Sequence, residues 1–184
     1  MRLLIMGPPG AGKGTQGELL ARRLGIPRHS TGDILRQALR DRTPMGLEAK
    51  RYMHAGELVP DDVILGIVGE ALAHEESEPG FLLDGFPRTV AQAEGLRKLL
   101  LDQGQNLDAI VDLSVPDDEI MKRLSTRGRK DDLLETIQRR LEVYGKKKKP
   151  LLDFYAARGV RIVSVEGVGD IDDIQADILE RLSL

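Results

Sequence analysis

A glycine-rich segment with one lysine, close to the start of the chain, is the first place where the residue types suggest chemistry. Gly7, Gly12 and Lys13 have the spacing G-x-x-x-x-G-K and come directly after the apolar run RLLIM. Glycines let the backbone turn so that several N–H groups face one anion, and a following helix directs its positive dipole end at the same anion. The motif therefore predicts a loop that binds a polyphosphate, with Lys13 bridging its last two phosphate groups.

A carboxylate stands where it could hold a metal ion. Asp84 ends the apolar segment FLLD, and α/β proteins bind ligands beyond the carboxyl ends of their strands. Because Mg²⁺ is usually held by one or two carboxylates together with phosphate groups, we expect Asp84 to hold it, directly or through water. Asp33 is a second candidate that would act through water. Both residues also have a structural interpretation: Asp84 as a helix cap or the partner of a loop salt bridge, and Asp33 as a helix cap.

The elements that position these residues alternate between strands and helices. Continuous apolar runs predict buried strands at 2–6, 80–84, 109–115 and 160–165, with a short strand near 27–29. Helical spacing of apolar residues predicts helices at 13–24, 33–55, from 61 onwards, and at 90–101, 117–125, 133–158 and 171–182. We expect a break near Pro44 and Gly46, and a kink or break at Pro150.

Strands that are separated by helices of this length form βαβ units and hence a parallel sheet. Right-handed crossovers then cover both faces of the sheet, so we predict an α/β protein with a three-layer α/β/α fold around five parallel strands. The 184 residues, of which 41% are hydrophobic, suit a single domain.

Charge and composition exclude several classes of protein. The 27 basic and 30 acidic residues give a net charge of −3, which argues against nucleic acid or a membrane surface as a partner. The sequence contains no cysteine, so disulfides and thiolate metal sites are excluded, and a reducing compartment fits. The first apolar run is too short for a signal peptide or a membrane span. We therefore expect a cytoplasmic monomer.

Five segments together resemble the adenylate kinases, a family of nucleoside monophosphate kinases. Gly14 follows Lys13 where Ser or Thr is usual, and Thr15 comes one residue later. The matching segments are GPPGAGKGTQ at 7–16, STGDILR at 30–36, GELVP at 56–60, FLLDGFPRT at 81–89 and RGRKDD at 127–132. They follow in the family's order over nearly the whole chain. The resemblance implies reversible, Mg²⁺-dependent transfer of the terminal phosphoryl group of ATP to AMP, which gives two ADP.

The resemblance also implies a role for individual residues. Those on the ATP side are Gly10, Ala11, Gly12, Lys13, Gly14, Thr15, Arg123, Arg127 and Gly169. Those on the AMP side are Thr31, Arg36, Glu57, Leu58, Val59, Gly85, Phe86, Pro87, Arg88, Gln92, Arg129 and Arg140. The implied catalytic residues are Lys13, Arg88, Arg123, Arg129 and Arg140. Arginine suits this role because its planar fork binds two phosphate oxygens and stays charged. The acceptor phosphate is already anionic, so no general base is required.

Three alternatives to this function remain open at the level of the sequence. A kinase of the same fold could act on UMP or CMP, although related UMP/CMP kinases carry alanine where Thr31 stands and asparagines after the F-P-R. Gln92 also favours adenine, because an amide can donate and accept a hydrogen bond at once. A nucleotide-dependent switch or ATPase would need a water-orienting group and a partner protein. A binding module with a degenerate loop would not need Lys13, Asp84 and the arginines together.

The resemblance also implies a small helical AMP-binding lobe at 30–59 and a short lid at 126–136, both inserted in the single domain. The implied lid and the helix after it contain two departures from the expected pattern. RGRKDD leaves space only for a tight loop, and without cysteine we expect no zinc knuckle. Leu133 and Leu134 are apolar where polar residues are expected, as packing residues of the lid or an exposed apolar step. Gly145 and the four lysines 146–149 interrupt a predicted helix, because glycine and neighbouring like charges destabilise helices. A role of these lysines in steering nucleotides is a further hypothesis.

Overall fold

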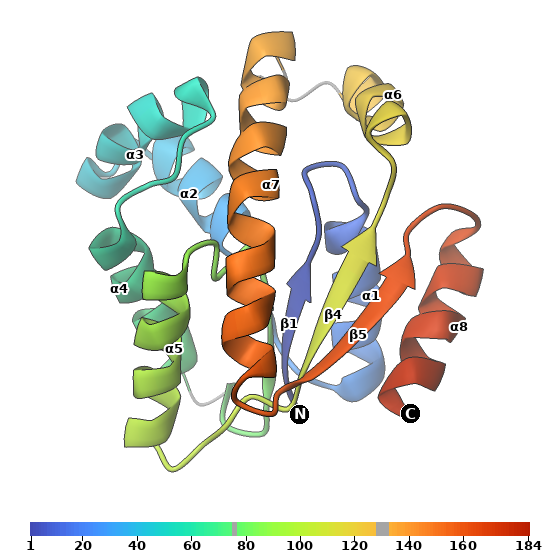
Figure 1. Ribbon diagram of the computed structural model, residues 1–184. Coiled ribbons are helices and arrows are strands. Elements are labelled where there is room, and N and C mark those ends of the chain that lie inside the picture. Colours follow the sequence, from blue (N-terminus) through green and yellow to red (C-terminus); the bar gives the residue numbers. More distant parts are fainter. Residues whose placement is uncertain (75–76, 128–132) are drawn as a thin grey trace.

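Five parallel strands form the centre of the computed structural model, which describes residues 1–74, 77–127 and 133–184, with only the backbone of Met45 and Arg127. The strands are β1 (Arg2–Met6), β2 (Arg28–Ser30), β3 (Phe81–Asp84), β4 (Ala109–Ser114) and β5 (Arg161–Glu166). Their order in the sheet is β2-β3-β1-β4-β5 (Figure 1). This arrangement confirms the predicted five-stranded parallel sheet.

Helices cover both faces of the sheet, because successive side chains of a buried strand point to opposite faces. Leu3 and Ile5 of β1 pack with α1 (Lys13–Leu24) and α8 (Ile171–Leu182). Leu4 and Met6 belong to the opposite core, which contains α4 (Asp61–Leu72), α5 (Val90–Asp102) and the second half of α7 (Leu134–Ala156). Figure 1 shows these two layers on either side of the strands, with α6 (Asp117–Arg127) beyond the end of β4. The three-layer prediction is confirmed.

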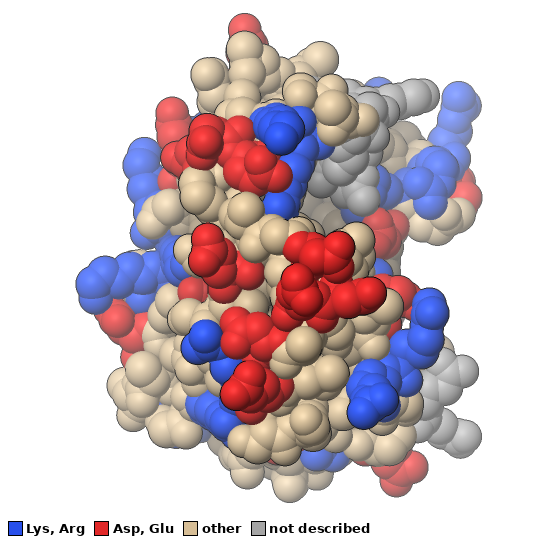
Figure 2. Space-filling model, turned by 90° about the vertical axis from the view of Figure 1, so that its right-hand side faces the viewer, with Lys and Arg blue, Asp and Glu red and all other residues tan. Residues whose placement is uncertain are grey.

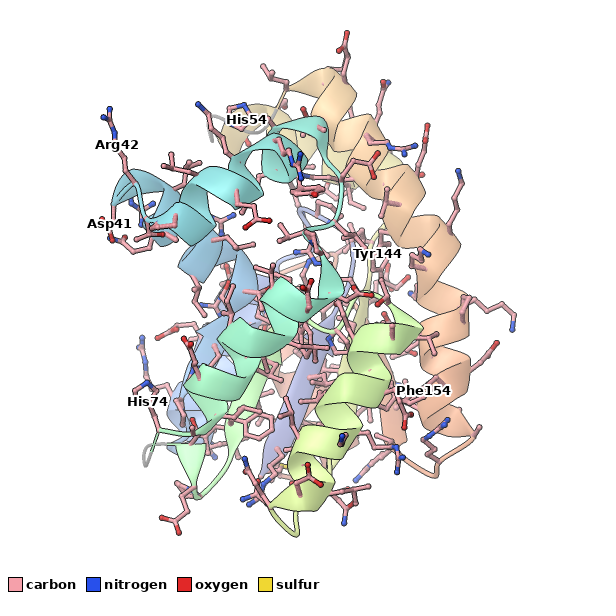
Figure 3. All side chains as sticks on the ribbon, turned by 90° about the vertical axis from the view of Figure 1, so that its left-hand side faces the viewer. Asp41, Arg42, His54, His74, Tyr144 and Phe154 are labelled. Atoms are coloured by element: carbon pink, nitrogen blue, oxygen red, sulfur yellow. The ribbon has the colours of Figure 1, made fainter. Side chains whose placement is uncertain are left out.

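A small helical unit made of α2 (Thr31–Arg40) and α3 (Pro44–Ala55) projects beside the sheet. The Ser30 side chain accepts a hydrogen bond from the Asp33 backbone N–H and so caps α2, while Thr43 caps α3. Asp41 and Arg42 lie at the outer tip, between the two helices (Figure 3). The chain therefore breaks at 41–43, just before Pro44. The predicted break at Gly46 is wrong, because this glycine lies inside α3.

Replacing Gly46 with alanine is expected to lower the free energy of unfolding by about 3 kcal/mol. A Cβ atom at this position would lie 2.2 Å from the carbonyl group of Ala38 and 2.5 Å from the Leu39 nitrogen. Both are backbone atoms of α2, so the two helices would have to separate. Urea denaturation measures the change. Gly66→Ala is the control, because its Cβ meets nothing within 4 Å, and this helix substitution should raise stability by about 0.5–1 kcal/mol. Equal effects of the two substitutions would contradict the prediction.

The long helix α7 runs without a break through Gly145 and Pro150, so the break predicted at Pro150 is wrong. Pro150 is exposed, and water can satisfy the carbonyl group that loses its helical hydrogen bond there. Tertiary contacts offset the poor local propensity: Lys148 Nζ lies 2.9 Å from Oδ2 of the buried Asp112 on β4. Tyr144 extends from α7 towards the interior of the molecule (Figure 3). Leu133 and Leu134, at the start of α7, are exposed, which favours the interpretation as an apolar step.

Acidic side chains gather on the side of the molecule that α6 and α8 form (Figure 2). The first turns of these helices contribute Asp117, Asp118, Glu119, Asp172 and Asp173, where negative charge stabilises the positive end of each helix dipole. Within the described ranges, no helix is long and apolar enough to cross a membrane.

Candidate functional site

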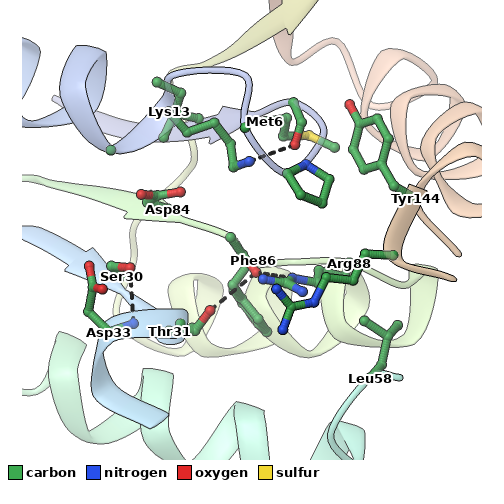
Figure 4. A pocket seen from close by; sticks show the side chains of 18 of the residues that line it. Met6, Lys13, Ser30, Thr31, Asp33, Leu58, Asp84, Phe86, Arg88 and Tyr144 are labelled. Atoms are coloured by element: carbon green, nitrogen blue, oxygen red, sulfur yellow. Dashed lines mark hydrogen bonds between the residues drawn. The ribbon is translucent and has the colours of Figure 1, made fainter. Parts of the chain in front are cut away.

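A cleft of about 600 Å³ opens at the carboxyl ends of β1, β2 and β3. The loop before α1 forms one wall, and α2, the end of α3 and the loop after β3 form the opposite wall. Residues of α6 and α7 complete the lining. Figure 4 shows Lys13 beside the end of β3 that carries Asp84, with Thr31 and Arg88 further into the cleft. Segments that are far apart in the sequence thus meet at one edge of the sheet.

The loop at 7–13 has the shape that its sequence predicts. Gly12 has φ 91° and precedes α1 without a side-chain cap, so the first turn of the helix presents its N–H groups to the cleft. Gly7 has φ 150°, and a Cβ there would lie 2.9 Å from the Leu113 carbonyl oxygen. Lys13 Nζ donates hydrogen bonds of 2.8 Å to the carbonyl oxygens of Gly7 and Pro8. The loop thus has the geometry expected of a polyphosphate-binding loop.

Three arginines from separate elements line the opposite part of the cleft, namely Arg36 of α2, Arg88 after β3 and Arg140 of α7. Arg88 Nε donates a hydrogen bond of 2.7 Å to the Gly85 carbonyl oxygen. Water reaches this side chain, but the walls of the cleft surround it, and this desolvation lowers the pKa of Arg88. The cation of Arg140 lowers the pKa further. The guanidinium groups therefore create a positive field that a bound anion would relieve.

Thr31 and Gln92 line the same part of the cleft and are bonded within the protein. Thr31 Oγ1 donates a hydrogen bond of 3.2 Å to the Gly85 carbonyl oxygen. Gln92 Oε1 accepts one of 2.7 Å from the Arg88 backbone N–H, and its Nε2 donates one of 2.7 Å to Asp61 Oδ1. An amide still has a second N–H and a second lone pair after these two bonds. The protein contacts thus orient the amide and leave it capacity for a ligand.

The described structure places most of the predicted site residues in the cleft. Besides those already described, the lining residues are Gly10, Gly14, Thr15, Asp33, Glu57, Leu58, Val59, Phe86, Pro87 and Arg123. Arg123 Nε donates a hydrogen bond of 2.8 Å to Glu119 Oε1, one turn earlier on α6.

Four of the predicted residues are not placed there. Ala11 is buried in the core under the loop, and Gly169, with φ 127°, lies between β5 and α8 and is not among the lining residues. Arg129 and the side chain of Arg127 lie outside the described residues.

One contact beside the cleft and one arginine within it were not anticipated. Arg139 is exposed, and its Nη2 lies 2.5 Å from Glu57 Oε1, so it ties α7 to the segment after α3. Arg28, on β2, lines the cleft, and its Nη2 lies 2.6 Å from Asp84 Oδ2. In the parallel pairing of β2 with β3, Ser30 lies opposite Asp84. Arg28 is two residues before Ser30, so its side chain points to the same face of the sheet as that of Ser30. This alternation along β2 is the sequence signal that could have indicated the contact with Asp84. Asp84 therefore has a salt-bridge partner, which lies on the neighbouring strand β2 and not in a loop.

Asp33 is charged and well hydrogen-bonded. Burial raises the pKa of Asp33, but hydrogen bonds from Arg36 and Ser30 lower it. The positive charges of Arg36 and Arg28 lower it further, so the net shift is downward. Ser30 is the N-cap of α2, so the interpretation of Asp33 as the helix cap is wrong, and its carboxylate pairs with Arg36 instead.

The oxygen donors fit a magnesium ion that arrives with a nucleotide. Asp84 is 6% exposed and ends β3 beside the phosphate loop, with Asp33 nearby across Arg28. Among the residues that the structure describes, no group of three or more His, Cys, Asp or Glu side chains is placed to hold a metal alone. Mg²⁺ usually completes its octahedral coordination with phosphate oxygens and water. One or two carboxylates are therefore enough for the protein's share of such a site.

The phosphate loop on a parallel sheet, facing arginines across one cleft, defines a P-loop phosphotransferase that acts on nucleotides. Residues 5–160 match the model of the family "Adenylate kinase". The chain belongs to the adenylate kinase family.

Individual relatives match over nearly their whole length. The protein named adenylate kinase in Leptospira biflexa serovar Patoc is 49% identical over 185 residues, which cover 98% of this chain and 99% of the relative. The adenylate kinase of Corynebacterium glutamicum strain R is 48% identical over 182 residues, with 99% of each chain covered. That of Bacillus subtilis strain 168 is 44% identical over 213 residues, covering 99% of this chain and 98% of the relative. The longer alignment means that the Bacillus relative contains residues that this chain lacks.

Proposed function

We propose that this protein catalyses the reversible transfer of the terminal phosphoryl group of Mg·ATP to AMP, which yields two ADP. The observation that carries this proposal is a single cleft with a phosphate loop on one wall and Arg36, Arg88 and Arg140 on the other. Two polyanions can be held there face to face, with cations around the transferring group. The matching relatives, all named adenylate kinase, support the same reaction.

Each wall has its own task in this reaction. The N–H groups at the start of α1 and Lys13 hold the triphosphate, and Arg123 and Arg127 assist them on the ATP side. Arg36 and Arg88 grip the AMP phosphate, while Arg129 and Arg140 reach towards both phosphate ends. Mg²⁺, held through Asp84, would neutralise charge on the phosphate oxygens when it is bound. The acceptor phosphate has a second pKa of about 6, so it is a competent nucleophile near neutral pH without a general base.

Exclusion of water is the remaining requirement, because water is a competing acceptor of the phosphoryl group. We propose that segment 30–59 moves as an AMP-binding lobe and segment 126–136 as a short lid that closes over the phosphates. Three hydrogen bonds already link the lobe to α7: Thr136 Oγ1 donates to the His54 carbonyl oxygen at 3.0 Å, Arg140 Nη2 to that of Met53 at 3.1 Å, and Arg139 Nε to Glu57 Oε1 at 2.7 Å. These bonds must break and reform as nucleotides enter and leave.

Direct substrate profiling tests the proposed function. The protein is mixed with ATP, Mg²⁺ and each of AMP, UMP and CMP, and ADP formation is followed. AMP should give the fastest transfer. Equal or faster transfer to UMP would assign the protein to the UMP/CMP kinases, and ATP hydrolysis without transfer would indicate a switch or ATPase.

Replacing Gln92 with leucine is expected to reduce the preference for AMP over UMP by about 10- to 100-fold, because the site loses its paired donor and acceptor for adenine. The ratio of the two kcat/KM values is the measurement. The same change leaves Asp61 Oδ1 and the Arg88 N–H without their Gln92 partner, so stability should fall by about 1–3 kcal/mol. Gln92→Glu keeps the acceptor and serves as the comparison. An unchanged nucleotide preference would remove Gln92 from the residues that read the base.

The same proposal includes a monomeric protein in the cytoplasm, with ATP, AMP and ADP as small-molecule substrates and Mg²⁺ as the cofactor. The absence of cysteine from the sequence is compatible with a reducing compartment. Size-exclusion chromatography with light scattering tests the oligomeric state.

A further inference from the structure

Arg28 forms a salt bridge with Asp84, the carboxylate that the proposed metal site needs. Its Nη2 lies 2.6 Å from Asp84 Oδ2, and the two side chains are 17% and 9% exposed. A charge-assisted hydrogen bond of this length in a sheltered position is among the stronger polar contacts in proteins. In this structure, the guanidinium group is therefore the counter-ion of Asp84.

Packing holds the Arg28 side chain against α1, directly below the phosphate loop. A Cβ on Gly17 would lie 3.3 Å from Arg28 Nε, and a Cβ on Gly14 would lie 3.4 Å from Arg28 Nη2. Nε itself is buried and meets no hydrogen-bond acceptor among the described residues. The guanidinium group is thus confined near the phosphate loop with one N–H donor unsatisfied. A second position that satisfies more of its donors would therefore also be favourable.

A second carboxylate lies within reach of the same nitrogen. Asp33 Oδ2 is 3.5 Å from Arg28 Nη2, and this side chain is 51% exposed. A small rotation of the guanidinium group would shorten that contact and release Asp84. Mg²⁺ and Arg28 both require the Asp84 oxygens, whereas Asp33 can accept a further donor beside Arg36.

We propose that Arg28 is a positioning residue that competes with Mg²⁺ for Asp84 and moves to Asp33 when the metal arrives with its nucleotide. Arg28 keeps the Asp84 carboxylate charged and oriented in the absence of nucleotide. It also weakens the hold of the protein on the metal, so the metal binds firmly only together with phosphates. This inference rests on the proposed function of Asp84 as a metal-holding residue.

The affinity for Mn²⁺, as a spectroscopic substitute for Mg²⁺, tests the inference. Electron paramagnetic resonance measures the concentration of free Mn²⁺. It therefore gives the dissociation constant of Mn²⁺ for the protein that has bound the non-hydrolysable β,γ-imido analogue of ATP. Arg28→Gln removes the competing charge, so Mn²⁺ should bind about tenfold more tightly. This is the gain expected when Mn²⁺ no longer has to displace one charge-assisted hydrogen bond from Asp84. Arg28→Lys keeps a cation but loses the fork, so its gain should be smaller. It also provides the test if Arg28→Gln does not fold.

Two further variants separate the possible outcomes. Asp84→Asn should weaken Mn²⁺ binding and abolish the gain from Arg28→Gln; if Asp84→Asn leaves Mn²⁺ binding unchanged, the metal role of Asp84 itself is wrong. If Asp84→Asn weakens binding but neither Arg28 variant strengthens it, only the competition is wrong. Arg22→Gln is the charge control, because Arg22 is an exposed residue of α1 that pairs with Glu18. An equal gain in Arg22→Gln would attribute the effect to net charge and overturn the inference.

Discussion

Replacing Arg88 with lysine is expected to lower kcat by about 100- to 1000-fold, while the melting temperature changes by less than about 3 °C. The planar fork of Arg88 can hold two phosphate oxygens at once, whereas an ammonium group acts as a single point charge. The head group points into the cleft and has its Nε bonded to a loop carbonyl rather than to the core. The fold should therefore tolerate the change. Steady-state kinetics and thermal unfolding measure the two quantities.

Arg97→Lys is the matched control for this variant. Arg97 lies on the exposed side of α5 and pairs only with Glu94 among its described partners, so kcat should stay within about twofold of the parent value. A large loss of thermal stability in Arg88→Lys would instead show that Arg88 is a structural residue. Normal turnover of that variant would remove it from the catalytic group.

Replacing Lys13 with methionine is expected to lower kcat by about a thousandfold, which is the upper range for the loss of one preorganised charged donor at a reacting phosphate. Lys13 Nζ is held at the loop by two carbonyl oxygens, so it can move onto a phosphate over a short distance. Methionine preserves the length and apolar stem of the side chain but removes the charge. Single-turnover phosphoryl transfer separates the chemical step from nucleotide binding.

Lys98→Met controls for the loss of one positive charge, because Lys98 is an exposed residue of α5. This control should be fully active. A fall in kcat of less than about tenfold in Lys13→Met would mean that the backbone N–H groups, rather than the lysine, stabilise the transferring group.

Much of the fold was predictable because buried parallel strands produce continuous apolar runs and helices produce a distinct apolar spacing. The phosphate loop was predictable because glycines and one lysine at fixed spacing define its backbone directly. Gly46 and Pro150 were misread for a different reason. Their local preferences oppose helix formation, but close contact with α2 and the packing of α7 on the core decide the outcome.

The sequence shows where the arginines stand in the chain, but it did not predict which residues they contact in the fold. The partners of Arg28 and Arg139 were not predictable, because nothing in the local sequence pattern reveals which carboxylates lie opposite them. Their partners Glu57 and Asp84 belong to segments that only the folded chain brings close. Ion pairs between distant segments depend on the register of paired strands and on the angle at which helices pack. No short stretch of the sequence determines either of these.

The pair of Lys148 and the buried Asp112 has a mechanical consequence for α7. Downstream of this pair the helix is embedded through Leu151, Phe154 and Tyr155, while upstream it brings Arg140 to the cleft. The embedded second half holds the helix against the sheet. We therefore expect a change in the tilt of its first half to shift Arg140 relative to the phosphate loop.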